Sequence, residues 1–316
     1  MITNWIRGCN FSRFVLLYLW VFISMKGGAH MGANNSVLTR VFTQNMLRGL
    51  MYDCNDAPIL SNIVKRYEIK YDGDSKNENI ISEIYQYLGS SYRNEYFYKN
   101  TLLNKLIISA HRLKTTTALT EVPVAKSKAD FIMINGKAVV YEIKTELDTF
   151  ERLESQISDY YKAFDHVCVV TSESQAKELL IRFKNSPVGV YVLTDKNTLK
   201  RLKEPQEFRG NLNKEQIFKI LNKPEYENIV KKAARGLPNV TPVQYYRECK
   251  RIACELPLDE LYSLFLKELK KRNRIDVIDF DQIPYALRFL VYFSKFQKDQ
   301  LVELNDYLKQ PFKGVK

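Results

Sequence analysis

The sequence predicts an α/β protein in which a mixed sheet is flanked by helical regions on both sides along the chain. Short apolar runs with the two-residue period of strands lie between residues 117 and 194, and amphipathic helical segments alternate with the later ones. Residues 213–316 carry helical spacing almost throughout. Early strands in a meander, followed by alternation of helix and strand, indicate antiparallel and parallel neighbours in one sheet with helices on both faces.

The predicted core begins with a helix at residues 93–112, whose apolar stripe is formed by Leu102, Leu103, Leu106 and Ile107. The remaining elements follow in the order strand, hairpin, helix, strand, helix, strand. Their predicted ranges are 117–124, 127–148, 148–165, 166–172, 173–183 and 188–194.

The flanking regions are predicted to be helical. Residues 31–92 contain three amphipathic pieces, of which the first, residues 35–51, starts at a possible Ser36 cap. A linker with Pro205 and Gly210 then separates the core, residues 93–204, from a basic helical region at residues 205–316.

Residues 1–30 are expected to lie outside the folded protein. The apolar run at residues 14–25 is shorter than the ~20 residues that a membrane span needs, and with Arg7 and Arg13 before it the segment resembles a signal peptide. Alternatively, codons for Lys26-Gly27-Gly28 can spell a bacterial ribosome-binding sequence just upstream of Met31. We favour this second interpretation, a misassigned leader, and therefore expect a cytoplasmic protein without stable membrane association.

The net charge and the cysteine pattern favour some classes of function and argue against others. Lys and Arg total 48 against 36 Asp and Glu, and this net charge of +12 favours a polyanionic partner such as nucleic acid or a membrane surface. The five cysteines include no CxxC pair and no neighbouring histidine, which argues against a zinc site. Their odd number argues against a disulfide framework and fits a reducing compartment.

Charged residues on the predicted hairpin at residues 127–148 raise a question of register. A two-residue Asn135-Gly136 turn, which the sequence preference favours, would put Asp130 and Glu142 on opposite faces. A loop of odd length, or a bulge, would put both carboxylates on the same face. The functional interpretation requires the second arrangement.

If the two carboxylates converge, their repulsion needs compensation. Two like charges about 4 Å apart repel by about 4 kcal/mol at an effective dielectric constant of 20. A divalent cation such as Mg²⁺, bound by hard oxygen ligands, would remove this cost. Lys144 shares a strand face with Glu142 and would point to the place of a metal-bound water. The plainer alternative is an exposed hairpin end with an ordinary Glu-Lys surface pair.

Four more residues are compatible with a site. Gln156 and Tyr160 are four apart on the next predicted helix and share one of its faces, although a solvated glutamine and a core tyrosine would explain them equally. Glu95 stands in the first turn of the preceding helix, where it could reach the sheet or simply satisfy the helix dipole. Glu121, on the first strand, is a competing acid.

Taken together, Asp130, Glu142-Ile143-Lys144 and Gln156 with Tyr160 resemble the PD-(D/E)XK nuclease superfamily, in the form with a RecB-type QxxxY motif. The predicted order αβββαβ also matches, so the resemblance implies a restriction-endonuclease-like core. More closely, residues 93–200 resemble a bacterial family of largely uncharacterised PD-(D/E)XK-like proteins. One departure is Ala129, which stands where the nominal motif has proline.

The resemblance implies a nuclease that uses Mg²⁺ or Mn²⁺ to hydrolyse phosphodiester bonds in nucleic acid, with DNA as the expected substrate. Asp130, Glu142 and Glu95 would be the metal ligands and catalytic acids. Lys144 would orient the attacking water.

The same resemblance implies that Gln156 and Tyr160 hold the site or the substrate strand. The alternative function is that of a noncatalytic nucleic-acid-binding or adaptor protein that retains the nuclease fold. Metal binding would separate the two, because only the enzyme needs the cation.

Overall fold

The computed structural model of the 316-residue chain describes residues 36–52, 57–108, 115–272 and 279–314. Two compact units divide the chain at Val37, and everything below concerns the second, Leu38–Lys316, apart from the first two residues of helix α2. The expected leader at residues 1–30 lies outside the described residues.

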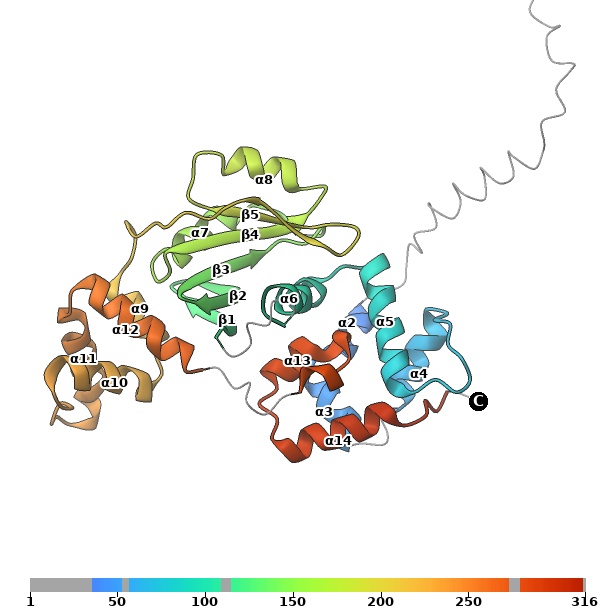
Figure 1. The fold of residues 1–316 in the computed structure, drawn as a ribbon. Helices are drawn as coiled ribbons and strands as arrows, with labels where there is room; N and C mark the ends of the chain where they lie inside the picture. Colours follow the sequence, from blue (N-terminus) through green and yellow to red (C-terminus); the bar gives the residue numbers. More distant parts are fainter. Residues whose placement is uncertain (1–35, 53–56, 109–114, 273–278, 315–316) are drawn as a thin grey trace, which may run out of the picture. The chain divides into compact units, whose positions relative to one another are not determined.

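A six-stranded mixed sheet forms the centre of this unit, and its strands follow one another in chain order (Figure 1). Strands β1 to β3 are antiparallel, β3, β4 and β5 are parallel, and β6 returns antiparallel to β5. This confirms the predicted mixed sheet. The strands are β1 Thr117–Val124, β2 Ser127–Asn135, β3 Lys137–Ile143, β4 His166–Ser172, β5 Gly189–Leu193 and β6 Leu199–Lys203.

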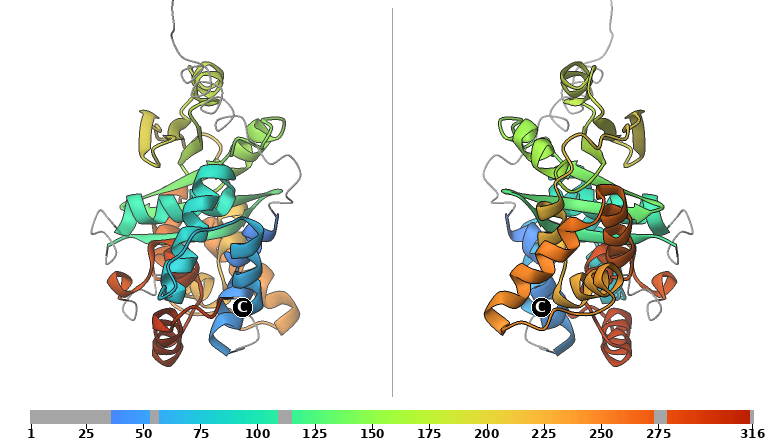
Figure 2. Two further views of the ribbon diagram at one scale, coloured as in Figure 1. Left: turned by 90° about the vertical axis from the view of Figure 1, so that its right-hand side faces the viewer. Right: turned by 90° about the vertical axis from the view of Figure 1, so that its left-hand side faces the viewer.

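The first and fourth strands have the bounds that the sequence predicts, whereas β6 was not predicted. Its sequence, LKRLK, has three exposed residues and lacks the apolar run of a core strand. Such charged, exposed strands are usual at sheet edges, where they discourage pairing with another chain. Figure 2 shows the twist that accumulates across the sheet, with yellow β6 steeply inclined to the green strands.

In chain order, helices precede the sheet, lie between its later strands and follow its last strand. The N-terminal set is α2 Ser36–Val41, α3 Gln44–Tyr52, α4 Ala57–Arg66, α5 Asn77–Ser91 and α6 Glu95–Leu103, followed by a π-helical turn at Asn104–Ile108. Between the strands lie α7 Leu153–Tyr160 and α8 Ala176–Arg182. The last set is α9 Lys214–Ile220, α10 Lys223–Ala234, α11 Pro242–Glu255, α12 Leu258–Lys270, α13 Arg288–Phe293 and α14 Lys298–Lys309.

The single helix predicted at residues 35–51 is wrong, because α2 ends at Val41 and α3 begins at Gln44. The Thr43 hydroxyl accepts a hydrogen bond from the backbone N–H of Met46 at 3.2 Å. This is the bond of an N-cap, which starts a new helix instead of continuing the old one.

The helices after residue 205 pack in two places. Helices α9 to α12 contact one another, with α9 also against β1 and α12 against β2. Helices α13 and α14 instead contact the N-terminal helices α3, α5 and α6. Figure 1 shows the two groups apart, in orange and red. The basic C-terminal region is helical as predicted, but it is not one packing unit.

One large apolar core joins a sheet face to α7 and to the orange helices. Fully buried members include Val140, Val169, Leu153, Phe218 and Phe265. This core fixes which residues of β3 point inward, and with them the orientation of Glu142. Across the described ranges, no helix combines the length and the apolar character that crossing a membrane requires.

Candidate metal centre

The hairpin between β2 and β3 closes around a single residue, Gly136. Its neighbours Asn135 and Lys137 pair with each other, so the predicted loop of odd length is confirmed and the two-residue turn is wrong. Gly136 has a φ of +75°, which only glycine adopts without steric cost. Continued along the strands, this register sets Asp130 opposite Glu142.

A third acid belongs to the same row of the sheet. Strand β1 pairs with β2 on both sides of Glu121, and the register sets Glu121 opposite Asp130, yet Glu121 itself makes no ladder pair. Its φ of +56° lies in the left-handed region, and the Thr120 hydroxyl donates to the Asp130 carbonyl at 2.7 Å beside it. A strained non-glycine residue of this kind costs ~1–3 kcal/mol and is commonest at functional sites.

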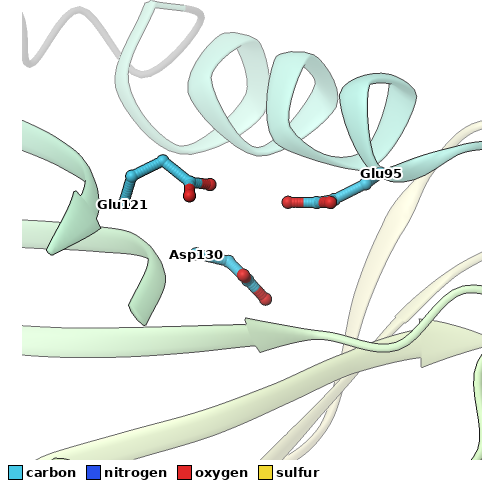
Figure 3. A group of neighbouring side chains, drawn as sticks. All are labelled: Glu95, Glu121 and Asp130. Carbon is cyan, nitrogen blue, oxygen red and sulfur yellow. The ribbon is translucent and has the colours of Figure 1, made fainter. Parts of the chain in front are cut away.

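Helix α6 brings a fourth carboxylate. The Asn94 side chain caps this helix by accepting from the Phe97 N–H at 3.1 Å, which makes Glu95 its first residue. Carboxylate oxygens of Glu95, Glu121 and Asp130 lie within 4.8 Å of one another (Figure 3). We call these three residues the acid cluster. Hard oxygen donors at this spacing fit Mg²⁺ or Mn²⁺.

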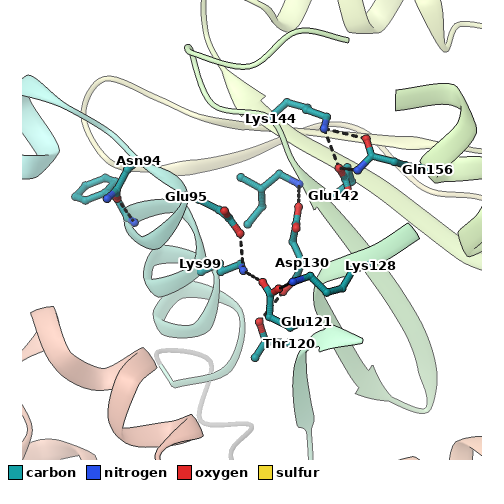
Figure 4. A network of polar contacts seen from close by, with 12 residues as sticks. Asn94, Glu95, Lys99, Thr120, Glu121, Lys128, Asp130, Glu142, Lys144 and Gln156 are labelled. Carbon is teal, nitrogen blue, oxygen red and sulfur yellow. Dashed lines mark hydrogen bonds and ion pairs between the residues drawn. The ribbon is translucent and has the colours of Figure 1, made fainter. Parts of the chain in front are cut away.

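A lysine that the sequence reasoning missed lies inside the acid cluster. The Lys99 ammonium is 2.5 Å from Glu95 and also pairs with Glu121 (Figure 4). Burial would lower the pKa of Lys99, which is 7% exposed, but the two glutamates outweigh this effect and raise it. The i, i+4 spacing of Glu95 and Lys99 is the sequence signal that could have revealed the pair.

Glu121 has a second cationic partner on the outer side. Lys128, whose side chain is 61% exposed, also pairs with it. Burial of Glu121 opposes ionisation, yet its bonds to Lys128 and then Lys99 lower the pKa of its carboxyl. Glu121 is therefore charged at neutral pH and available as a ligand.

Asp130 has the most perturbed environment of the three acids. Its Oδ2 accepts from the backbone N–H of Ile143 at 2.8 Å. Burial first, and the neighbouring charge of Glu142 second, raise the pKa of Asp130 to about 8. Without a metal, Asp130 therefore retains its proton at neutral pH, and a bound cation would stabilise its ionised form.

Glu142 lies outside the acid cluster, although it was predicted as a ligand. It is 1% exposed, and its Oε1 accepts from Gln156 Nε2 at 2.6 Å and pairs with Lys144 Nζ at 2.9 Å. Its Oε2 lies 2.5 Å from the Tyr160 hydroxyl, which also faces the Lys128 carbonyl at 2.9 Å. We call Glu142, Lys144, Gln156 and Tyr160 the buried network.

The buried network is closed by the lysine. Lys144 Nζ donates to Gln156 Oε1 at 3.0 Å, which also fixes the direction of the Gln156 amide. Burial, followed by the charge of Glu142, raises the pKa of Tyr160 well above its usual value. Figure 4 shows Lys144 turned toward Gln156 and away from Glu121.

Every predicted site residue thus lies in one of two adjacent groups, and Asp130 connects them electrostatically. Glu95, Asp130 and Glu142 were predicted as metal ligands, but in the structure the third acid beside Glu95 and Asp130 is Glu121. The spacing of Gln156 and Tyr160 does place both side chains on one helix face, toward Glu142.

Comparison with known proteins shows to which family the chain belongs. The family model described as Bacteriophage P4 protein cII matches residues 89–280, which is more than half of the chain. The chain belongs to this family. Among curated proteins, Protein cII of Enterobacteria phage P4 is 25% identical over 199 residues, covering 61% of this chain and 69% of that protein. No solved structure shows a significant match.

The matched range contains the whole sheet and both groups of the candidate site, from Glu95 to Tyr160. It also includes α9 to α12, of which α9 and α12 contact strands of the sheet, and it ends at residue 280, before α13. The names of the family and of the relative state no activity, so function has to be argued from the chemistry of the site.

Proposed function

We propose that this member of the P4 cII family is a metal-dependent nuclease that hydrolyses phosphodiester bonds, with DNA as its substrate and the bacterial cytoplasm as its compartment. The observation that carries the proposal is the meeting of three carboxylates beside a buried Glu-Lys pair. The order α6, β1, β2, β3, α7, β4 is compatible with a restriction-endonuclease-like αβββαβ core.

Asp130, Glu95 and Glu121 are the residues that would hold Mg²⁺ or Mn²⁺, and Glu142 lies next to Asp130 with both of its oxygens already bonded. The bound ion would supply Lewis-acid stabilisation of phosphate charge and a water of lowered pKa. Since Asp130 carries an unfavourable charge at pH 8 and above, a cation would be most strongly attracted to its side of the cluster.

The buried network would keep the second half of the site rigid. Gln156 and Tyr160 hold Glu142 by short hydrogen bonds, and Glu142 with Gln156 holds the Lys144 ammonium. A lysine fixed in this way can orient an attacking water or contact a phosphate oxygen without losing side-chain entropy during the reaction. The net charge of +12 favours binding of the polyanionic substrate.

A second candidate function follows from Lys99. Because this lysine already pairs with two of the three acids, the cluster can be explained as an ion-pair network that needs no metal. The protein would then be a noncatalytic nucleic-acid-binding or adaptor protein. The two candidates differ in whether a divalent cation binds.

The deciding experiment combines calorimetry with a cleavage panel on the full chain. Titration with Mn²⁺ should show binding at the site, and labelled single-stranded DNA, duplex DNA and RNA should be cleaved with Mg²⁺ or Mn²⁺ but not with a chelator. Binding of nucleic acid without metal binding and without cleavage would reject the enzyme and leave the adaptor.

A further inference from the structure

A short segment near the C-terminal end contacts both of the elements that bring glutamates to the acid cluster. It consists of the 3₁₀ turn η5 Tyr285–Leu287 and most of α13, and we call residues 285–292 the brace. Helix α6, which carries Glu95, packs against α13 (Figure 1). Strand β1, which carries Glu121, is bonded by the last residue of the brace. The brace lies after residue 280, where the match to the family model ends.

Asn100 joins α6 to the brace. Its side chain is fully buried, and its Nδ2 donates to the Tyr285 carbonyl at 3.0 Å and to the Tyr85 hydroxyl at 2.9 Å. Its Oδ1 accepts from the backbone N–H of Phe289 at 3.0 Å. A buried amide that is bonded on both its nitrogen and its oxygen keeps one orientation, because each lost bond would leave a buried polar group unpaired.

A second hydrogen bond holds α6 to the brace. The Tyr96 hydroxyl donates to the Ala286 carbonyl at 2.5 Å. Tyr96 and Asn100 directly follow Glu95 and Lys99 in the helix, so the two pairs lie on neighbouring faces of α6. The brace therefore holds the helix face next to the one that carries Glu95 and Lys99.

Tyr292 joins the brace to β1. Its hydroxyl accepts a hydrogen bond from the backbone N–H of Ala118 at 2.9 Å. Ala118 lies in the same strand as Glu121, three residues before it. The first part of the brace thus bonds to α6 and its last residue bonds to β1, which fixes the distance between the two elements.

We propose that the brace sets the spacing of α6 and β1 and thereby the affinity of the acid cluster for a divalent cation. Asn100 and Tyr292 are positioning residues, which act through α6 and β1 and not as ligands. The proposal rests on the proposed function and deepens it, because it names what determines metal affinity at that site. Mg²⁺ requires ligand oxygens at about 2.0–2.1 Å in near-octahedral geometry, so a displaced helix or strand should weaken its binding.

The hydroxyl of Tyr292 can be removed with a matched control. Tyr292→Phe deletes the hydrogen bond to Ala118 and keeps the ring. Tyr262, on α12, likewise accepts from a backbone N–H, that of Asp165 at 3.2 Å, directly before β4. Tyr262 is 2% exposed and Tyr292 is only partly buried, so Tyr262→Phe should cost at least as much stability.

The α6 end of the brace has a matched control as well. Asn100→Ala removes the amide that bonds α6 to the brace. Asn77, on α5, is 6% exposed and donates from Nδ2 to the Tyr307 carbonyl of α14 at 2.9 Å. Asn77→Ala therefore also removes a buried bond to the C-terminal helices, but from a helix that carries no residue of the acid cluster.

The experiment is calorimetric titration of the full chain and the four variants with Mn²⁺, beside their melting temperatures in a chelator. All four variants should melt below wild type. We expect Mn²⁺ binding to weaken about tenfold in Asn100→Ala and about threefold in Tyr292→Phe, at or below the lower end of what changes outside the ligands usually cost. Tyr262→Phe and Asn77→Ala should bind Mn²⁺ as wild type does.

Three results would overturn the inference. Wild-type Mn²⁺ affinity in Tyr292→Phe and Asn100→Ala rejects the brace and leaves the nuclease standing. Equal weakening by the brace variants and their controls also rejects it, because general loss of stability would then explain the effect. If wild type binds no Mn²⁺, the metal-dependent nuclease is rejected together with the brace. If Asn100→Ala does not fold, Tyr292→Phe and Tyr262→Phe decide alone.

Discussion

The acid cluster and the buried network are neighbours, but they differ in exposure and in how their charges are satisfied. The side chains of Glu95 and Glu121 are 55% and 40% exposed, whereas that of Glu142 is 1% exposed. The two glutamates of the acid cluster pair with lysine ammonium groups, and Asp130 accepts a backbone N–H. Glu142 in the buried network has ionic and neutral hydrogen-bond partners on both oxygens.

The difference separates two tasks that one site has to perform. Because Glu95 and Glu121 are partly exposed, a metal ion could replace a lysine partner while water continues to solvate the carboxylates. A buried carboxylate with three fixed partners cannot exchange ligands readily, because each lost hydrogen bond would leave a buried charge unsatisfied. The acid cluster is therefore suited to bind, and the buried network to position.

The largest effect is expected from Asp130→Ala, which removes the acid shared by both groups. We expect loss of at least ~10³-fold in cleavage rate, because a metal ligand and its electrostatic contribution disappear together. Single-turnover cleavage at saturating Mg²⁺ measures this. Asp259→Ala, which removes an 81% exposed carboxylate on α12, is the control and should retain wild-type activity. Wild-type cleavage by Asp130→Ala would refute the site.

A smaller loss is expected from Lys144→Met, which acts on the buried network only. The rate should fall by about 10²- to 10⁴-fold, which is the usual contribution of one positioned acid, base or charge. Metal binding should be nearly unchanged, since Lys144 does not contact the acid cluster. Calorimetry with Mn²⁺ beside the cleavage assay checks both statements. Loss of metal binding here would show that the two groups do not divide the tasks as we infer.

Lys99→Met is expected to strengthen metal binding at the acid cluster. Lys99 and a metal ion compete for Glu95 and Glu121, so its removal should tighten Mn²⁺ binding by about tenfold. Lys128→Met is the matched control, since Lys128 pairs with Glu121 from the solvent and its exposed pair is worth little. If Lys99→Met binds Mn²⁺ no better than wild type, Lys99 is not the competing cation.

The smallest effect concerns stability and pH. Because the pKa of Asp130 is raised to about 8 in the folded protein, the folded state retains a proton that the unfolded state releases from about pH 4 upward. Raising the pH from about 4 to about 8 therefore destabilises the metal-free protein progressively, and above that range the loss of stability is complete. Asp130→Asn removes this penalty.

We expect the melting temperature of metal-free Asp130→Asn to exceed that of wild type by at least about 3 °C more at pH 9 than at pH 5. Thermal unfolding in a chelator at the two pH values measures the gap. Added Mn²⁺ should shrink it, because the cation relieves the same repulsion in wild type. A gap independent of pH would mean that Asp130 ionises normally.

The sequence alone determined the local elements around this site. The apolar residues of β1 and the continuous apolar run of β4 predicted the bounds of these strands, because strand propensity depends on neighbouring residues. Helical spacing likewise placed Gln156 and Tyr160 on one face. Such features depend on neighbours within a few residues, and they are readable before folding.

Which acids lie next to one another depends on tertiary packing. The Asn-Gly preference favoured a two-residue turn, but burial of Val140 and its neighbours set the register that opposes Asp130 and Glu142. Glu121 joined the cluster through a left-handed backbone at one residue, and Lys99 through the approach of α6 to the strands. These contacts join residues far apart in the chain, and their geometry follows from packing, which no local pattern encodes.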